Sequence, residues 1–251
     1  MVAKPVSQFS TGVRLFARGL KVYGRSPGLV LLGIVPALIT LLLFAFLFGL
    51  LVYFVDDLSA DVTWFADDWS DGWRTAIHIA AGVGLIGIAL LVWVVSFTAV
   101  TLVIGEPFYE KISERVEAHL GGGPGEVRSG FWKELGRGIR DSIRVTALSV
   151  LIGVPLFLCG FIPVVGQTVV PVIGALVGGW FLSVELVGVA FTRRGLRMRD
   201  RLAHLRTRRW TALGFGVCVF LCFLIPLGSV LIMPAAVAGG TLLAREVLDE
   251  A

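Results

Sequence analysis

The chain has 251 residues, of which 56% are hydrophobic and only 16% are charged, with a formal net charge of +4. Soluble domains carry about 25% charged residues, so the composition excludes a soluble enzyme or a disordered chain and predicts an integral membrane protein. Its cysteines, Cys159, Cys218 and Cys222, lie in apolar runs, so neither a disulfide framework, a metal site nor a cofactor is expected. In a membrane protein the basic excess usually sets topology, and no nucleic-acid binding is expected.

Residues 1–25 form a basic segment without acids, which predicts a cytoplasmic N-terminus. Phe9, Val13, Phe16 and Leu20 recur at helical spacing within it. We therefore expect an amphipathic helix that lies in the inner membrane interface.

A first transmembrane helix is predicted at about 28–55, a stretch without charge that exceeds the roughly 20 residues needed to span the hydrocarbon core. A Ser-Pro pair before it is typical of a helix start, so the N–H groups of Gly28 and Leu29 would face the inner surface at the positive end of the helix dipole. With Arg25 as the nearest base, this start is a candidate anion site. The alternative is an ordinary helix start.

The next segment, 56–74, holds six aspartates against one arginine, which predicts an external loop before a second transmembrane helix at about 75–104. Residues 106–144 are predicted to return to the cytoplasm as a helical hairpin, because apolar residues recur every four positions on both sides of a glycine-rich break. Three charged residues at its start form either an ion-pair network at the inner mouth of a pore or a solvated helix face: Glu106, Glu110 and Arg115.

Two further apolar segments are broken by proline and glycine, which predicts membrane hairpins at about 145–192 and 210–244. The segments on both sides of the first hairpin are predicted to be cytoplasmic, so we expect this hairpin to enter from the cytoplasm and to turn without fully crossing; the second is a re-entrant hairpin or one broken span. Glu185 is the one acid embedded in an apolar run, and it either gates a wet path or pairs with Arg193 or Arg194.

The two hairpins repeat each other at an offset of 63 residues, with nine identities in 23 positions that include Cys159 with Cys222. Chance likeness between apolar segments is the alternative. Paired, proline-broken membrane segments often mark a transport path. The eight-arginine loop between them, 193–209, either attracts anions or fixes topology and contacts anionic lipid.

The segment Glu106-Pro-Phe-Tyr109, followed by Glu114 and Val116, resembles the CysZ and etoposide-induced-protein family. Further agreement comes from three places in order along the chain: Gly28-Leu29 ahead of Pro36, Arg193-Arg194-Gly195, and Gly239-Gly240-Thr241. The resemblance implies a single multi-pass membrane domain over 1–251, with two long spanning helices, two half-penetrating hairpins and often a dimer. It also implies sulfate uptake in the bacterial branch, whereas a eukaryotic branch of membrane proteins has no clear transport role.

In the bacterial permeases that this chain resembles, arginines that help to hold sulfate typically follow the Gly-Leu pair, whereas here Val30 and Leu31 follow it. Two functions therefore stay open. The first is a cytoplasmic-membrane permease for an inorganic oxyanion, with sulfate as the leading candidate and both termini in the cytoplasm. The second is a non-transporting membrane protein that scaffolds partners or shapes the envelope. Neither is an enzyme, since no nucleophile–base pair or phosphate-binding loop occurs in the sequence.

Overall fold

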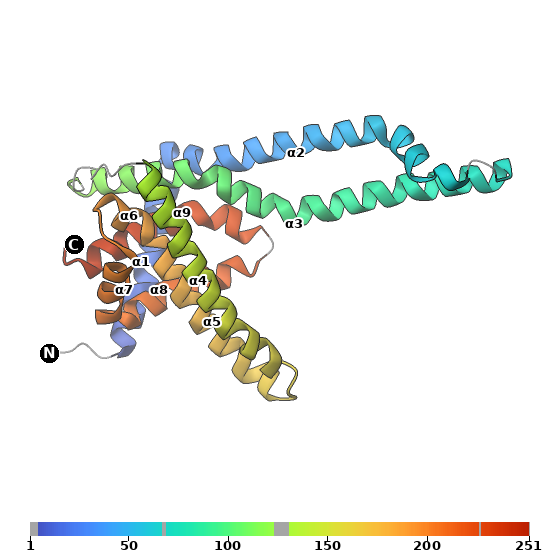
Figure 1. Ribbon diagram of the computed structural model, residues 1–251. Helices are drawn as coiled ribbons and strands as arrows, with labels where there is room; N and C mark the ends of the chain where they lie inside the picture. The colour runs from blue at the N-terminus through green and yellow to red at the C-terminus, as the bar shows by residue number, and fades with distance from the viewer. Residues whose placement is uncertain (1–4, 67–68, 123–130, 226, 251) are drawn as a thin grey trace. The chain divides into compact units, whose positions relative to one another are not determined.

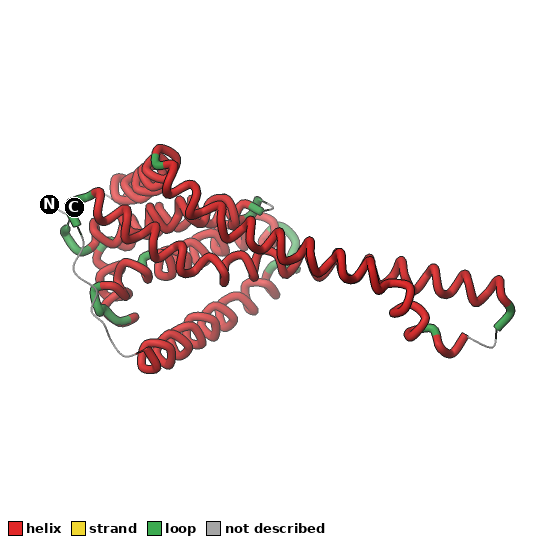
Figure 2. The backbone as a smooth tube through the Cα atoms, turned by 90° about the horizontal axis from the view of Figure 1, so that it is seen from above, coloured by secondary structure: helices red, strands yellow, loops and turns green. Residues whose placement is uncertain are grey.

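A computed structural model describes residues 5–66, 69–122, 131–225 and 227–250, and the regular elements within these ranges are all helical (Figures 1 and 2). Four helical stretches of the described chain are long and apolar enough to cross a membrane: Pro27–Val62, Asp71–Val94, Val165–Arg193 and Gly228–Val247. The predicted class, an all-α integral membrane protein, is confirmed. The chain divides into two compact units, the first formed by Met1–Gly33 with Pro107–Ala251 and the second by Ile34–Glu106.

The second unit is an antiparallel pair made from the larger parts of α2 (Pro27–Val62) and α3 (Asp71–His119), joined through the short 3-10 helix η1 (Trp64–Ala66), whereas the start of α2 and the end of α3 belong to the first unit (Figure 1). Aromatic rings hold the pair together: Trp93 packs against Phe44 and Phe48, with centroids 6.0 and 5.5 Å away. With 36 residues, α2 is about 54 Å long at 1.5 Å per residue, which exceeds the hydrocarbon core of about 30 Å. The helix therefore continues beyond the predicted span.

The predicted cytoplasmic hairpin 106–144 is helical, but its arms are not separate helices. Its first arm is the end of α3, which continues through Pro107 to His119 and stops where Gly121 and Gly122 take positive φ angles of 98° and 93°. Its second arm is the start of α4 (Phe131–Cys159). The rest of the predicted glycine break, at 123–125, lies outside the described residues. Charged residues begin at Glu106, but a helix need not end where charged residues begin.

The core of the first unit is formed by α1 (Pro5–Arg25), α5 (Val165–Leu186), α8 (Arg209–Phe223) and α9 (Gly228–Val247). Their backbones approach closely through glycine: a Cβ added at Gly12 would lie 2.0 Å from the carbonyl oxygen of Thr211 on α8. Small residues allow such approaches between membrane helices. The predicted amphipathic helix is thus present as α1, but it buries Leu15 between glycines and leaves Leu20 exposed, because α8 and α9 cover a different face from the predicted stripe.

The predicted internal repeat is confirmed by the two hairpins α4–α5 and α8–α9. Their second helices begin at Val165 and Gly228, which are 63 residues apart, and each follows a left-handed residue: Val164 with φ 69° and Leu227 with φ 60°. Equivalent hydrogen bonds recur after these residues, from the N–H of Thr168 to Val164 and from that of Leu231 to Leu227. Pro226, which follows Pro163 by the same 63 residues, lies outside the described residues.

The arms of the hairpins differ in length. The 15 residues of α8 extend about 22 Å, too short for the hydrocarbon core, and the apolar part of α4, Val145–Cys159, is equally short. The second arms, α5 with 22 residues and α9 with 20, could each span it. That the hairpins penetrate only partway stays a prediction. Two shorter helices, α6 (Gly188–Arg193) and α7 (Met198–Thr207), connect α5 to α8.

Candidate functional site

The side-chain carboxylate of Glu117 is buried in the first unit and pairs with two arginines. Glu117 lies one turn after the buried Ser113 on α3, since residues four apart share one side of a helix, and Ile112 and Val116 beside them are buried too. Its side chain is only 1% exposed. Two consecutive arginines from the end of α6 satisfy both of its oxygens, with Arg193 Nη1 2.8 Å from Oε2 and Arg194 Nη1 2.5 Å from Oε1.

The same network holds the C-terminal segment. Arg194 also pairs with Glu250 at 2.5 Å, and this hydrogen bond is the largest cause that lowers the pKa of Glu250, against the opposing effect of burial. Burial alone would lower the pKa of Arg194, but its hydrogen bonds to Glu250 and Glu117 outweigh that effect and raise it. Arg245 on α9 donates to the carbonyl oxygens of Leu120 and Gly122 at the end of α3, where the helix dipole favours a cation.

The predicted pairing of Glu185 with Arg193 or Arg194 is wrong. Both arginines bind Glu117 instead, and Glu185 is exposed on α5 and forms no ion pair within the described residues. The prediction assumed that one continuous helix carries Glu185 and the two arginines, whereas α5 ends at Leu186 and α6 begins only at Gly188.

At the start of α2, the predicted anion site has a different set of donors. The N–H of Leu29 is bonded to the carbonyl oxygen of Ser26 at 2.8 Å, and the Leu29 side chain is buried, so this predicted donor is already used. Gly28 and Arg25 are exposed. The structure adds Arg115 from α3, whose Nη1 donates to the carbonyl oxygen of Gly28 at 3.3 Å. A guanidinium thus lies beside the helix start, although none follows Leu29 in the sequence.

The predicted network at the end of the second span, formed by Glu106, Glu110 and Arg115, stays a prediction. Glu106 and Glu110 are exposed and lie one turn apart on α3, but Glu106 belongs to the second compact unit. Lys111 pairs with Glu114 at 2.6 Å on the exposed side of the helix, and Arg115 contacts the start of α2. Arg115, from the predicted network, thus contacts Gly28, from the predicted anion site.

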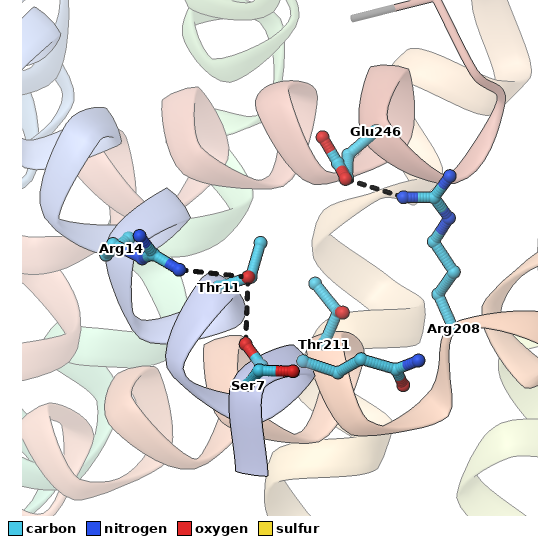
Figure 3. A pocket seen from close by; sticks show the side chains of 7 residues that line it. Ser7, Thr11, Arg14, Arg208, Thr211 and Glu246 are labelled. Carbon is cyan, nitrogen blue, oxygen red and sulfur yellow. Dashed lines mark hydrogen bonds and ion pairs between the residues drawn. The ribbon is translucent and has the colours of Figure 1, made fainter. Parts of the chain in front are cut away.

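A polar pocket of about 360 Å³ lies between α1, α8 and α9 (Figure 3). One side is made by α1, and the other by Arg208 just before α8 together with side chains of α8 and α9. On α1, Arg14 donates to the hydroxyl of Thr11 at 3.3 Å, and that hydroxyl donates to the carbonyl oxygen of Ser7 at 2.9 Å. The lining residues are Ser7, Gln8, Thr11, Arg14, Arg208, Thr211 and Glu246.

The two arginines of the pocket differ in their charge balance. Arg208 pairs with Glu246 at 2.6 Å and also with Asp249, whereas Arg14 has no carboxylate partner among the described residues. The pocket therefore holds one guanidinium that lacks a carboxylate partner among the described residues, and a guanidinium is a donor suited to an oxyanion. Sequence reasoning missed this site, since it counted Arg14 only as a topology charge.

Signals for the missed residues exist in the sequence. Ser7, Thr11 and Arg14 follow helical spacing on α1, which places their side chains on one face. Glu117 follows Tyr109 by eight residues and Val116 by one, so it interrupts a buried stripe with a charge. A charge at such a position needs a partner, and that requirement could have identified it.

Comparison with known proteins places the chain among membrane transporters. It matches the family described as "Sulfate transporter CysZ/Etoposide-induced protein 2.4" over residues 15–234. It is 30% identical over 240 residues to the sulfate transporter CysZ of Pseudomonas aeruginosa strain PAO1, covering 92% of this chain and 93% of the relative. The sulfate transporter CysZ of Pseudomonas paraeruginosa strain PA7 is 31% identical with the same coverage. That of Pseudomonas fluorescens strain Pf-5 is 35% identical over 151 residues, or 59% of this chain and 60% of the relative.

Proposed function

Because the chain belongs to the sulfate transporter CysZ/etoposide-induced protein 2.4 family, we propose that it is a permease that passes sulfate across the cell membrane into the cytoplasm. The observation that carries this proposal is a likeness to sulfate transporters that extends over 92% of the chain and 93% of the relative. Four helical stretches capable of crossing a membrane agree with it. The protein moves its substrate without a chemical reaction, as a homodimer with both termini in the cytoplasm.

The start of α2 is the proposed place where sulfate binds. Arg115, held 3.3 Å from the carbonyl oxygen of Gly28, supplies from α3 the guanidinium that Val30 and Leu31 do not supply. Arg25 adds a second positive charge at the end of α1. A dianion at this position would also interact with the positive end of the α2 dipole.

The polar pocket is the second candidate for the anion, because Arg14 lies there without a carboxylate partner among the described residues. The Thr211 side chain lines the same pocket from α8 (Figure 3). The two places share no residue, so single substitutions separate them. The Glu117 network, by contrast, has its charges paired and is proposed to hold the inner ends of the helices in position.

Uptake of radiolabelled sulfate by cells that lack their own sulfate import tests the proposal. Gly28→Val should reduce uptake, because a Cβ at Gly28 would lie 2.8 Å from Arg115 Nη1 and the guanidinium would have to move. Arg115→Gln should reduce it too, by about tenfold to a hundredfold if one charge-assisted hydrogen bond of about 1.5–3 kcal/mol is lost. Lys111→Gln, an exposed change one turn away, is the matched control and should import normally.

Each outcome of this experiment has a definite meaning. Loss of uptake in Arg14→Gln, with Arg115→Gln unaffected, would move the binding site to the polar pocket. No uptake by the unaltered protein, at a membrane abundance equal to that of a working importer, would refute the permease and favour the scaffold. The observation behind that alternative is the apolar pair Val30 and Leu31 after the Gly-Leu motif.

A further inference from the structure

A second cavity, independent of the proposed sulfate sites, lies in the first unit between α4, α5, α7 and α8. It is a groove of about 560 Å³. From residue 176 to residue 184 it follows α5 for about 12 Å at 1.5 Å per residue. Its walls are apolar side chains that include Leu148, Ile152, Leu176, Trp180 and Phe181.

One rim of this groove is strongly basic. Three arginines from α7 and the start of α8 line it, and all three are exposed: Arg199, Arg206 and Arg209. None of the three has a carboxylate partner among the described residues. Arg209 lies over the ring of its neighbour Trp210, with Cζ 5.5 Å from the ring centroid.

The arginine-rich loop is thereby divided into two groups with different roles. Arg193, Arg194 and Arg208 pair with carboxylates and fix the fold. Arg201 donates to the carbonyl oxygen of Val184 and so holds α7 against the end of α5. Within the part of the chain that the structure describes, the three rim arginines make no such contact with an acid, and they line the same apolar groove.

We propose that this groove binds one anionic phospholipid, with an acyl chain against α4 and α5 and the phosphate among the rim arginines. Basic pockets beside apolar helix surfaces on the inner side of a membrane bind such headgroups, and long arginine side chains reach the phosphate plane. A neutral lipid would leave three guanidinium groups uncompensated, and a water-soluble anion would leave the apolar walls uncovered. A second copy of the chain, meeting this face with the same face, would add three more positive charges.

The nearby acids do not neutralise the rim. Asp200 on α7 accepts the backbone N–H of Arg197 at 2.8 Å and so caps the helix start. Glu185 follows the lining residue Val184 on α5 but does not line the groove. The net charge of the groove lining is therefore positive, from its arginines alone.

Lipid titration of the purified, delipidated full chain tests the proposal by native mass spectrometry. Dioleoyl phosphatidylglycerol and dioleoyl phosphatidylcholine share their acyl chains and differ in headgroup charge. The first should bind about tenfold more tightly, since its headgroup has a net negative charge that the arginines attract, whereas the choline of the second cancels the charge of its phosphate. Glycerol phosphate, which has the charge but no chain, should compete poorly. Equal affinity for the two lipids, or strong competition by glycerol phosphate, would overturn the proposal.

Variants identify the groove as the place where the lipid binds. Arg206→Gln with Arg209→Gln should abolish the preference for phosphatidylglycerol. Arg18→Gln with Lys21→Gln, which removes the same charge from the exposed side of α1, should keep it. Leu148→Trp should block the groove and weaken both lipids. Equal loss in the two charge variants would show a general surface attraction and would overturn the proposal, as would a Leu148→Trp protein that changes oligomeric state while it binds lipid normally.

Discussion

Replacing Glu117 by glutamine keeps the size of the side chain but removes the charge that two arginines share. Removing one partner of a buried ion pair costs about 3–5 kcal/mol, because the other charge stays buried without compensation. Here the lower value applies. The side chain of Arg194 is 5% exposed but keeps Glu250, and that of Arg193 is 17% exposed and can turn partly toward water. We expect a loss of about 3 kcal/mol in the free energy of unfolding.

A loss of that size corresponds to a fall in Tm of about 6–12 °C for a chain of this length. Scanning fluorimetry in detergent can follow it, because the protein has 7 tryptophans. The matched control is Glu114→Gln on the same helix, where the pair with Lys111 is 2.6 Å long but the two side chains are 50% and 43% exposed. That variant should lose less than about 1 kcal/mol. Equal shifts in Tm for the two variants would refute the assignment of Glu117 as a buried bridge.

Three further predictions concern Glu250, Glu185 and the topology of the chain in the membrane. Because Arg194 lowers the pKa of Glu250 in the folded state, Glu250 adds stability above its ordinary pKa of about 4.3, and that stability is lost as the pH falls through the lowered value. Glu250→Gln should therefore be less stable than the unaltered protein at neutral pH and equally stable in strong acid. A difference in stability that does not change with pH would contradict this. Glu185→Gln should change Tm little, since Glu185 is exposed and makes no ion pair within the described residues; a large fall would show a partner. In a variant without native cysteines, a reagent that does not cross membranes should label a cysteine at Asp61 in intact cells and should not label one at Ala203, and the reverse would overturn the topology.

Charge and apolar runs were enough to predict the helical class, and the offset of 63 residues between the two proline-broken segments predicted where their second helices begin. A charge-free stretch can be recognised from the sequence without knowledge of the tertiary structure. The offset of 63 residues appears again between the two helix starts at Val165 and Gly228. The partners of charged side chains could not be predicted in this way. Glu117 lies 76 residues from Arg193 in sequence, and their pairing depends on where α5 ends and how α6 is placed.

The predicted anion site at the start of α2 also depends on a residue that is distant in the sequence. The start of α2 was predicted from Ser26 and Gly28, which act locally. The guanidinium beside it comes from Arg115, 87 residues away, and only packing of α3 in the first unit places it there. The sequence predicted that the N–H of Leu29 would donate to an anion, but this N–H donates to the carbonyl oxygen of Ser26 in the turn that begins the helix.

Sulfate flux into liposomes that contain only the purified protein tests the central claim most directly. We expect radiolabelled sulfate to enter these liposomes faster than protein-free ones, with entry that saturates and that excess unlabelled sulfate suppresses. The Arg115→Gln protein should show the same maximal insertion into the bilayer but reduced sulfate entry. Entry equal to that of protein-free liposomes, with the unaltered protein folded and inserted, would contradict the claim that this chain is a sulfate permease.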